Sequence, residues 1–203
     1  MIIKRLELGP MANFQYLVGD QASKFVAAID PGWETDEIIS EAKRAGLKIT
    51  HILLTHTHFD HVNCAASLAK KTGASIYVHY SEAGGIGEDV IKTEDGTKIK
   101  VGGLEIACLH TPGHSPGSQC FLAGQAIFTG DTLFVDGVGR TDLDGSDPEE
   151  MFKSLQKLAA LPGGTIVYPG HNYGVEPTSS IEEQKKRNPY LKMRNIGEFL
   201  RGA

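Results

Sequence analysis

Cysteine is scarce in this chain, with three residues among 203, and no two of them have the CxxC spacing. An odd number without that spacing gives no sign of a disulfide framework. Cys64, Cys108 and Cys120 lie in apolar stretches with alternating or helical spacing, so we expect small buried side chains in a reducing compartment. Cys64 follows His61 by three residues, but we leave it out of the candidate metal ligands.

Long apolar runs and an excess of positive charge are also missing. No run approaches the roughly 20 apolar residues that span a bilayer. Residues 1–6 alternate like a strand and do not resemble a signal peptide. The formal net charge of −5 gives no general attraction to nucleic acid or to anionic membranes. We therefore expect a cytoplasmic protein with no nucleic-acid or membrane partner, and nothing in the sequence indicates its oligomeric state.

Glycine and proline are plentiful, with 24 and nine residues spread between periodic segments. This spread indicates tight turns and no linker, and the length suits a single domain, 1–203, with a substantial core. Apolar patterns predict strands at 2–8, 14–18, 25–29, 49–54, 76–78, 98–101, 104–109, 119–122, 126–128 and 165–168, the last strand. They predict helices at about 35–44, from 62 to Gly73, from a cap at Ser146 or Asp147 to 160, and at 181–187, with a surface loop at 83–95. This order predicts an α/β fold of two mixed sheets packed together with helices on the outside.

One loop concentrates potential metal ligands, because residues 55–61 have the sequence THTHFDH. His56 and His58 are two apart, so on an extended segment they point to the same side. His58 and His61 are three apart, where the next helix begins, and can converge on one region. These imidazoles and Asp60 suit zinc, iron or manganese, and they are too many for one metal with an open position, which indicates two metals. The alternative is a polar loop in which Asp60 caps the helix and the histidines are surface groups.

Three later strands end in the same way. TPGH at 111–114, FTGD at 128–131 and YPGH at 168–171 each place a potential ligand directly after an apolar strand and a glycine. These ligands are His114, Asp131 and His171. Strand ends that open into loops are where rigid scaffolds carry their chemistry. One such ending could be accidental, but three of them added to the histidine loop predict a shared metal site.

These four motifs, in this order and with IDPG at 29–32, resemble the metallo-β-lactamase superfamily over nearly the whole chain. The resemblance implies an αββα sandwich with a two-metal site at one edge of the sheets. It implies seven ligands, with His56, His58 and His114 on one metal, Asp60, His61 and His171 on the other, and Asp131 bridging the two. It also implies two divalent ions, zinc first with iron or manganese as alternatives, and catalytic roles for Asp60 and Asp131. The remaining histidines match no ligand position and are expected in strands or behind the ligands: His51, His79 and His110.

Further stretches resemble one branch of that superfamily. GDTLFV at 130–135 and GRTDL at 139–143 are similar to the glyoxalase II branch, whose members hydrolyse S-acylglutathione thioesters. NPYL at 188–191 resembles the short bacterial members of the branch. The resemblance implies that Arg140 and Tyr173 contact glutathione, whereas the alternative for Arg140 is a solvated turn residue. The long form carries a C-terminal helical domain with further glutathione contacts, and this chain stops at Ala203.

A thioester suits this ligand set chemically. Two metals about 3.5–4 Å apart can acidify a shared water and polarise the carbonyl, so the expected nucleophile is a metal-bridging hydroxide. The leaving thiolate has a conjugate-acid pKa of about 8.5 and can depart without a general acid. The sequence shows no spare acid beyond the ligand set. We therefore expect a metal-dependent hydrolase that cleaves a small-molecule thioester of the S-acylglutathione type.

The strongest alternative is a persulfide dioxygenase, which shares these motifs but uses one iron. The iron would be held here by His56, His114 and Asp131, a triad with open positions for oxygen and a glutathione persulfide. A β-lactamase would use the same metals, but nothing marks an antibiotic-binding loop. A nuclease of the superfamily would carry extra basic domains. A non-enzymatic binding module would be expected to lose ligands, and all seven are present.

Overall fold

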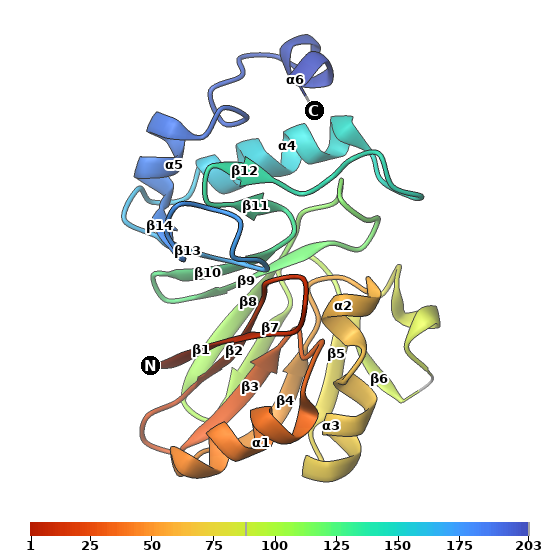
Figure 1. Cartoon of the computed structure of the whole chain (residues 1–203), viewed down its shortest axis with the longest axis vertical. Helices are drawn as coiled ribbons and strands as arrows, with labels where there is room; N and C mark the ends of the chain where they lie inside the picture. The colour runs from red at the N-terminus through yellow and green to blue at the C-terminus, as the bar shows by residue number, and fades with distance from the viewer. Residues whose placement is uncertain (88, 203) are drawn as a thin grey trace.

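The computed structural model describes residues 1–87 and 89–202, and in this part of the chain two six-stranded sheets pack face to face (Figure 1). The first sheet has the strand order β1-β2-β3-β4-β5-β6. Its strands are β1 (Ile2–Leu8), β2 (Asn13–Gly19), β3 (Phe25–Ile29), β4 (Lys48–Leu53), β5 (Ser75–His79) and β6 (Val90–Thr93). The strands from β1 to β3 are antiparallel and those from β3 to β6 are parallel, so this sheet is mixed.

The second sheet has the order β14-β13-β10-β9-β8-β7. Its strands are β7 (Lys98–Val101), β8 (Leu104–His110), β9 (Gln119–Ala123), β10 (Ala126–Gly130), β13 (Ile166–Pro169) and β14 (Ser179–Ser180). β10 and β13 are parallel neighbours, and the other pairs are antiparallel. A short hairpin of β11 (Leu133–Phe134) and β12 (Gly137–Val138) forms a separate two-stranded sheet, and β11 lies against β10 and β13.

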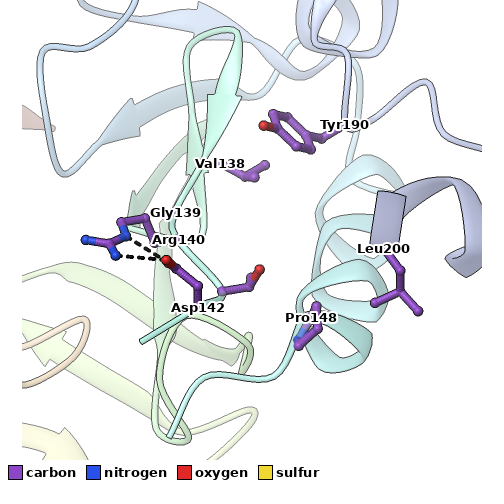
Figure 2. A pocket seen from close by; sticks show the side chains of 8 residues that line it. Val138, Gly139, Arg140, Asp142, Pro148, Tyr190 and Leu200 are labelled. Carbon is purple, nitrogen blue, oxygen red and sulfur yellow. Dashed lines mark hydrogen bonds and ion pairs between the residues drawn. The ribbon is translucent and has the colours of Figure 1, made fainter. Parts of the chain in front are cut away.

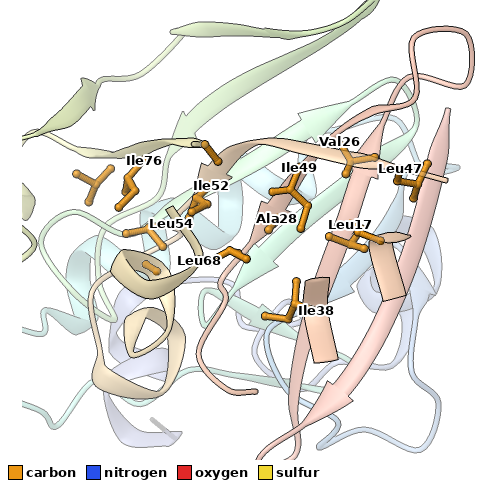
Figure 3. Close-up of a cluster of buried hydrophobic side chains, with 14 of the residues drawn as sticks. Leu17, Val26, Ala28, Ile38, Leu47, Ile49, Ile52, Leu54, Leu68 and Ile76 are labelled. Atoms are coloured by element: carbon orange, nitrogen blue, oxygen red, sulfur yellow. The ribbon is translucent and has the colours of Figure 1, made fainter. Parts of the chain in front are cut away.

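Helices α1 (Thr35–Arg44) and α3 (Ala65–Thr72) cover the outer face of the first sheet. α1 has acidic residues in its first turn and basic residues in its last turn, which suits the helix dipole. Ile38 and Ala42 are four residues apart, so they lie on one face and are buried. Figure 3 shows Ile38 and Leu68 among the apolar side chains of the sheet, including Leu17 and Ile52. This cluster forms the first of three apolar layers.

The second apolar layer lies between the two sheets and is rich in aromatic rings. Tyr16 of β2 and Phe128 of β10 meet edge to face with ring centroids 5.1 Å apart, and Phe128 stacks on Tyr168 at 5.0 Å. Every residue of β2 and β10 is buried. A strand between a facing sheet and an outer helix layer has no exposed side, which explains why these two segments are buried along their whole length instead of alternating between buried and exposed residues.

Helices α4 (Pro148–Ala159), α5 (Ile181–Arg187) and α6 (Ile196–Gly202) lie over the outer face of the second sheet (Figure 1). The carboxylate of Asp147 accepts hydrogen bonds from the backbone N–H groups of Glu149 and Glu150, so Asp147 is the cap and not Ser146. Pro148 occupies the first helical position, where its missing N–H costs nothing. With helices on both outer faces, the predicted αββα arrangement is confirmed.

Three details of the predicted elements are wrong. The predicted loop at 83–95 contains β6, which pairs with β5, and Glu88 of that loop lies outside the described residues. The predicted strand at 165–168 is not the last, because β14 follows it. The sequence analysis also missed α6. β6 and β14 are short edge strands and α6 is a short terminal helix, so each depends on contacts with distant neighbours and has little periodicity of its own.

The topology brings the ends of several strands to one edge. β8 and β10 both pair antiparallel with β9, so they run in the same direction, and β13 runs parallel to β10. The loops after these three strands therefore open at the same edge of the second sheet. The loop after β4 meets them there, because Gln119 N donates to Thr55 O at 2.8 Å. Among the described residues, no helix is both long and apolar enough to cross a bilayer.

Replacing Phe128 by alanine should lower the free energy of unfolding by about 3–5 kcal/mol, because its ring fills the layer between the sheets. Phe25→Ala, at a partly exposed strand end, is the matched control and should cost less than about 1 kcal/mol. Urea unfolding with chelator present measures both without a contribution from bound metal. A Phe128→Ala variant within about 1 kcal/mol of the wild type would contradict the prediction.

Candidate metal centre

The histidine loop leaves the first sheet at the end of β4. His56 and His58 follow that strand, and Asp60 and His61 lie on α2 (Phe59–Val62), a single helical turn. His56, Asp60 and His61 are buried. Asp60 does not cap this helix through its side chain, because it lies within the turn and His58 occupies the cap position. The alternative of a polar surface loop is therefore wrong.

The second sheet supplies three more side chains at the same edge. His114 follows β8, Asp131 follows β10 and His171 follows β13. The glycine before His171 is required by close packing, because a Cβ on Gly170 would lie 2.5 Å from Asp131 Oδ1 and 3.0 Å from His61 Cε1. The repeated glycine-then-ligand pattern therefore has a steric reason at this position.

The first cluster consists of His56, His58 and His114, whose ligand atoms lie within 4.8 Å of one another. His58 Nδ1 and His114 Nε2 are 2.9 Å apart. Each ring meets the other two edge to face, with centroids 4.6–4.9 Å apart. Three imidazoles that converge in this way could hold one cation.

The second cluster consists of Asp60, His61 and His171, and all three side chains are buried. His61 Nε2 lies 3.1 Å from His171 Nε2. Asp60 Oδ2 lies 3.4 Å from the Nε2 atom of each histidine. Asn13 Nδ2 donates to the same Asp60 oxygen at 2.9 Å and so fixes the carboxylate.

Asp131 lies between the two clusters. Its Oδ2 atom is 3.3 Å from His171 Nε2 and 3.6 Å from His114 Nε2, and its Oδ1 atom is 3.4 Å from His61 Nε2. One carboxylate therefore reaches imidazoles of both clusters. Of the predicted ligand set, the structure brings together all seven side chains.

The donor set fits a pair of metal ions. Ligands about 2.0–2.1 Å from a tetrahedral metal are about 3.3 Å from one another, and the separations above lie around that value. His56 Nε2 and Asp131 Oδ1 are buried without a hydrogen-bond partner among the described residues. A buried orphan nitrogen or carboxylate oxygen is costly unless a ligand satisfies it. The two clusters joined by Asp131 thus fit a dinuclear metal site.

Asp30 orients His61 and is not needed as a ligand itself. It also lies within ligand distance of His56 and His61. However, its Oδ1 accepts from Thr55 N at 2.7 Å, and its Oδ2 accepts from the Thr55 hydroxyl at 2.6 Å and from His61 Nδ1 at 3.0 Å. Both oxygens are therefore occupied, and the contact at Nδ1 leaves Nε2 of His61 free for a metal.

Other ligands are oriented in the same manner. His114 Nδ1 donates to the backbone carbonyl of Arg140 at 2.9 Å, and His171 Nδ1 donates to that of Met11 at 2.9 Å. His56 Nδ1 donates to the Thr55 hydroxyl at 3.0 Å. In each case the outer contact fixes the tautomer and directs Nε2 inward.

The electrostatics of the site favour a cation. Burial raises the pKa of Asp131, but His61, His171 and His56 outweigh this and hold the pKa far below its usual range. Burial lowers the pKa of His61, but Asp131, Asp30 and Asp60 outweigh this and raise the pKa to about 9. Burial, with His61 beside it, holds the pKa of His56 well below its usual value. The carboxylate is thus ionised and His56 neutral, which are the states that bind a metal.

The clusters open into a cavity of about 800 Å³ with a largely apolar wall. Its lining residues outside the ligand set are Met11, Phe59, Phe134, Gly137, Val138, Arg140, Leu143, Asp144 and Tyr173. Both predicted substrate contacts therefore lie on this cavity. Tyr173 stacks on His171 with ring centroids 4.6 Å apart. Burial, together with Asp131 and Asp60, raises the pKa of Tyr173, so its hydroxyl stays protonated at neutral pH.

Arg140 is exposed at the rim and is not a free cation. Its Nε and Nη2 atoms donate to Asp142 at 2.8 and 2.9 Å, as Figure 2 shows. The same segment also borders a second cavity of about 430 Å³, lined on its far side by Pro148, Tyr190 and Leu200. The side chain of Arg140 is thus exposed and paired with Asp142, while its backbone carbonyl accepts a hydrogen bond from His114 Nδ1.

Sequence reasoning missed several residues that shape the site. Asn13 carries no local signal, and Phe59 lies within the THTHFDH motif but is not a ligand type. Asp30 belongs to the IDPG motif, but its contact with His61 spans 31 positions. The histidines expected away from the ligands are away from them: His79 stacks on His110 with centroids 4.1 Å apart, and His51 stacks on Tyr77. Cys108 and Cys120 are buried and Cys64 is half-buried, and all three are free thiols.

A sandwich with this ligand arrangement at its edge defines a class of metal-dependent enzymes. The sequence model described as the Metallo-beta-lactamase superfamily matches residues 8–171. The chain therefore belongs to the metallo-β-lactamase superfamily, and the resemblance seen in the motifs is confirmed.

Individual relatives within the superfamily differ in activity. The chain is 36% identical over 193 residues to the probable polyketide biosynthesis zinc-dependent hydrolase BaeB of Bacillus velezensis, covering 93% of this chain and 86% of that protein. It is 37% identical over 186 residues to hydroxyacylglutathione hydrolase of Pseudomonas entomophila, covering 85% and 70%. The crystal structure of ETHE1 from Myxococcus xanthus is similar with a TM-score of 0.92 and 34% identity, covering 99% of this chain and 89% of that chain.

Replacing Gly170 by alanine should reduce metal binding, because its Cβ would displace the Asp131 carboxylate. We expect the affinity for metal to fall roughly 10- to 100-fold, as for other changes that move a ligand. Gly164→Ala is the control, since a Cβ at Gly164 meets nothing within 4 Å. Elemental analysis after dialysis against dilute Zn²⁺ measures both. Equal metal content in the two variants would contradict the steric argument.

Proposed function

We propose that this protein is a two-metal hydrolase that cleaves acyl thioesters of the S-acylglutathione type. The observation that carries the proposal is the pair of ligand clusters joined by Asp131 and open to one apolar cavity. A hydrolytic relative and a hydroxyacylglutathione hydrolase among the similar proteins support it.

The seven side chains have separate roles in this proposal. His56, His58 and His114 hold one divalent ion, Asp60, His61 and His171 hold the other, and Asp131 bridges them, with zinc expected first. Two bound divalent ions supply Lewis acidity toward the carbonyl and lower the pKa of a water at the site. Asp60 and Asp131 contribute charge that is already fixed before substrate arrives, because Asn13 holds Asp60 and the imidazoles hold Asp131 ionised.

The cavity wall suits the two ends of such a substrate. Phe59, Phe134 and Leu143 offer apolar surface for an acyl group close to the clusters. Tyr173 offers a protonated hydroxyl, and Arg140 offers a cation at the rim for the carboxylates of a glutathione-type thiol. A few polar groups in a mostly apolar pocket are typical of a small-molecule site.

The acids available on the cavity decide which leaving group the site can release, because an alkoxide or amine must be protonated as it leaves. Asp60 and Asp131 belong to the ligand set, and the third, Asp144, is exposed at the rim. A buried acid beside the clusters, which an alkoxide or amine would need, is not among the residues that line this cavity. A thiolate needs no such acid.

We expect the purified protein to hold two metals per chain and to release thiol from S-lactoylglutathione at the same rate with and without oxygen. Asp131→Ala should lower kcat/KM at least roughly 100-fold and reduce the metal content, because the bridge between the clusters is lost. Asp36→Ala, on an exposed carboxylate of α1, is the control and should leave both unchanged. Thiol release measured with a chromogenic disulfide, alongside elemental analysis, tests this. No thiol release by the two-metal protein would overturn the proposal.

The second candidate is a mono-iron persulfide dioxygenase. The fold likeness to ETHE1 favours it, since a bovine relative of that name is a persulfide dioxygenase. His56, His114 and Asp131 would hold the iron. A single iron per chain, with oxygen consumed in the presence of glutathione persulfide, would support this candidate and exclude the hydrolase.

Arg140→Ala should raise KM for S-lactoylglutathione roughly tenfold with little change in kcat, because the contact is equal in ground and transition states. Asp142→Ala should lower KM, because it frees the guanidinium from its ion pair. The same acyl group on an uncharged thiol is the control, and its KM should not respond to Arg140→Ala. Equal effects on both substrates would show that Arg140 does not contact the thiol carboxylates.

A further inference from the structure

Glu82 joins the two loops that carry the first cluster. It lies between β5 and η1 (Ala83–Gly85), a 3-10 helix of one turn. Its Oε2 accepts from the Thr57 hydroxyl at 2.8 Å. Its Oε1 accepts from Gly117 N at 2.8 Å and from the Ser115 hydroxyl. Thr57 stands between His56 and His58, and Ser115 directly follows His114, so one carboxylate is bonded next to all three histidines.

The loop after β8 is shaped to receive this carboxylate. A Cβ on Gly117 would lie 2.7 Å from Glu82 Cγ and 3.0 Å from its Cδ, so only glycine leaves room for the side chain. The Ser115 hydroxyl is also 2.8 Å from the Ser118 hydroxyl, and Ser118 Oγ accepts from Ser115 N at 3.1 Å. Glu82 is therefore packed and hydrogen-bonded on the side facing the ligand loops, and its position does not depend on one contact.

The two loops come from different sheets, which gives this bridge its importance. His56 and His58 follow β4 of the first sheet, whereas His114 follows β8 of the second. The backbone link between these loops, from Gln119 N to Thr55 O, lies on the strand side of the ligands. Glu82 connects them at the ligands themselves. Fixing two loops before a cation arrives removes an ordering cost from binding.

We propose that Glu82 is a positioning residue for the first metal subsite, holding His56 and His58 at the distance from His114 at which the three imidazoles share one cation. It acts through Thr57 and Ser115. The proposal rests on the ligand assignment of the proposed function, but not on the substrate. The second subsite has its own supports in Asn13, Asp30 and the Met11 carbonyl, so the effect of Glu82 falls on one subsite.

Three variants of Glu82 distinguish the effect of its side-chain length from the effect of its negative charge. Glu82→Ala removes the bridge, and Glu82→Asp keeps the charge but is one methylene too short to reach both loops. Glu82→Gln keeps the length, since its amide oxygen can accept from Ser115 and Gly117 while its NH₂ donates to the Thr57 hydroxyl. Glu105→Ala is the matched control, because Glu105 is an exposed glutamate of β8 that pairs with Lys98 on the neighbouring strand.

Competitive Co²⁺ titration of the metal-free proteins tests the proposal, with anomalous diffraction from Co²⁺-loaded crystals giving the occupancy of each subsite. Glu82→Ala and Glu82→Asp should weaken one of the two sites roughly 10- to 100-fold and leave the other unchanged. Glu82→Gln should stay within about threefold of the wild type, and Glu105→Ala should match it. The lost occupancy should lie at His56, His58 and His114.

The contrary outcomes are distinct. Unchanged Co²⁺ affinity in Glu82→Ala overturns the proposal. So does equal weakening of both sites together with a lower Tm of the metal-free protein, which is the result of a purely structural role. If the wild type binds two metals but cleaves no thioester, the proposed substrate is wrong. The Co²⁺ titration then still decides whether Glu82 positions the first subsite.

Discussion

The site depends on one largely buried carboxylate, that of Asp131, whose side chain is 11% exposed. This carboxylate lies within 3.6 Å of imidazole nitrogens from both clusters, and its Oδ1 atom has no hydrogen-bond partner among the described residues. An isolated buried carboxylate costs many kcal/mol, so the surroundings must supply positive charge. Protonated His61 does so in the absence of metal, which is why its pKa is raised, and two dications would do so more strongly. The strand arrangement allows this, since β8, β10 and β13 end at the same edge and their loops meet at Asp131.

Close packing and outer hydrogen bonds keep this arrangement in place. Gly170 allows Asp131 to approach His61, and Gly117 allows Glu82 to reach the loop that holds His114. Backbone carbonyls and the Asp30 carboxylate accept from the outer nitrogens of the histidines, so the inner nitrogens have one orientation. A pre-oriented donor set binds a cation without first ordering its loops. The glycine-rich composition is therefore partly a consequence of the site.

The sequence predicts most of the fold because the signals are local. The mainly apolar segment 14–18 predicts a strand, and the cap residue before Pro148 predicts the start of a helix. Both elements are present. The ligands were visible because each either directly follows a glycine or lies within the THTHFDH motif. Asn13 and Glu82 were not visible, since their contacts with Asp60 and Ser115 cross 47 and 33 positions. Strand β6 was missed because three of its four residues are exposed or half-buried. The single-domain organisation, the cytoplasmic location and the ligand roles stay predictions.

The ligand set alone does not decide between hydrolysis and oxygenation, but its supports favour two metals. A chain that used one iron on His56, His114 and Asp131 would leave the second cluster without a cation. Here Asp60, His61 and His171 are all buried, and each is oriented by a separate outer partner: Asn13, Asp30 and Met11. Burying three polar side chains with unfilled inner positions is costly. A second cation offsets that cost, and it also gives Asp131 a partner for each oxygen. The contacts around the second cluster therefore support the two-metal site of the proposed function.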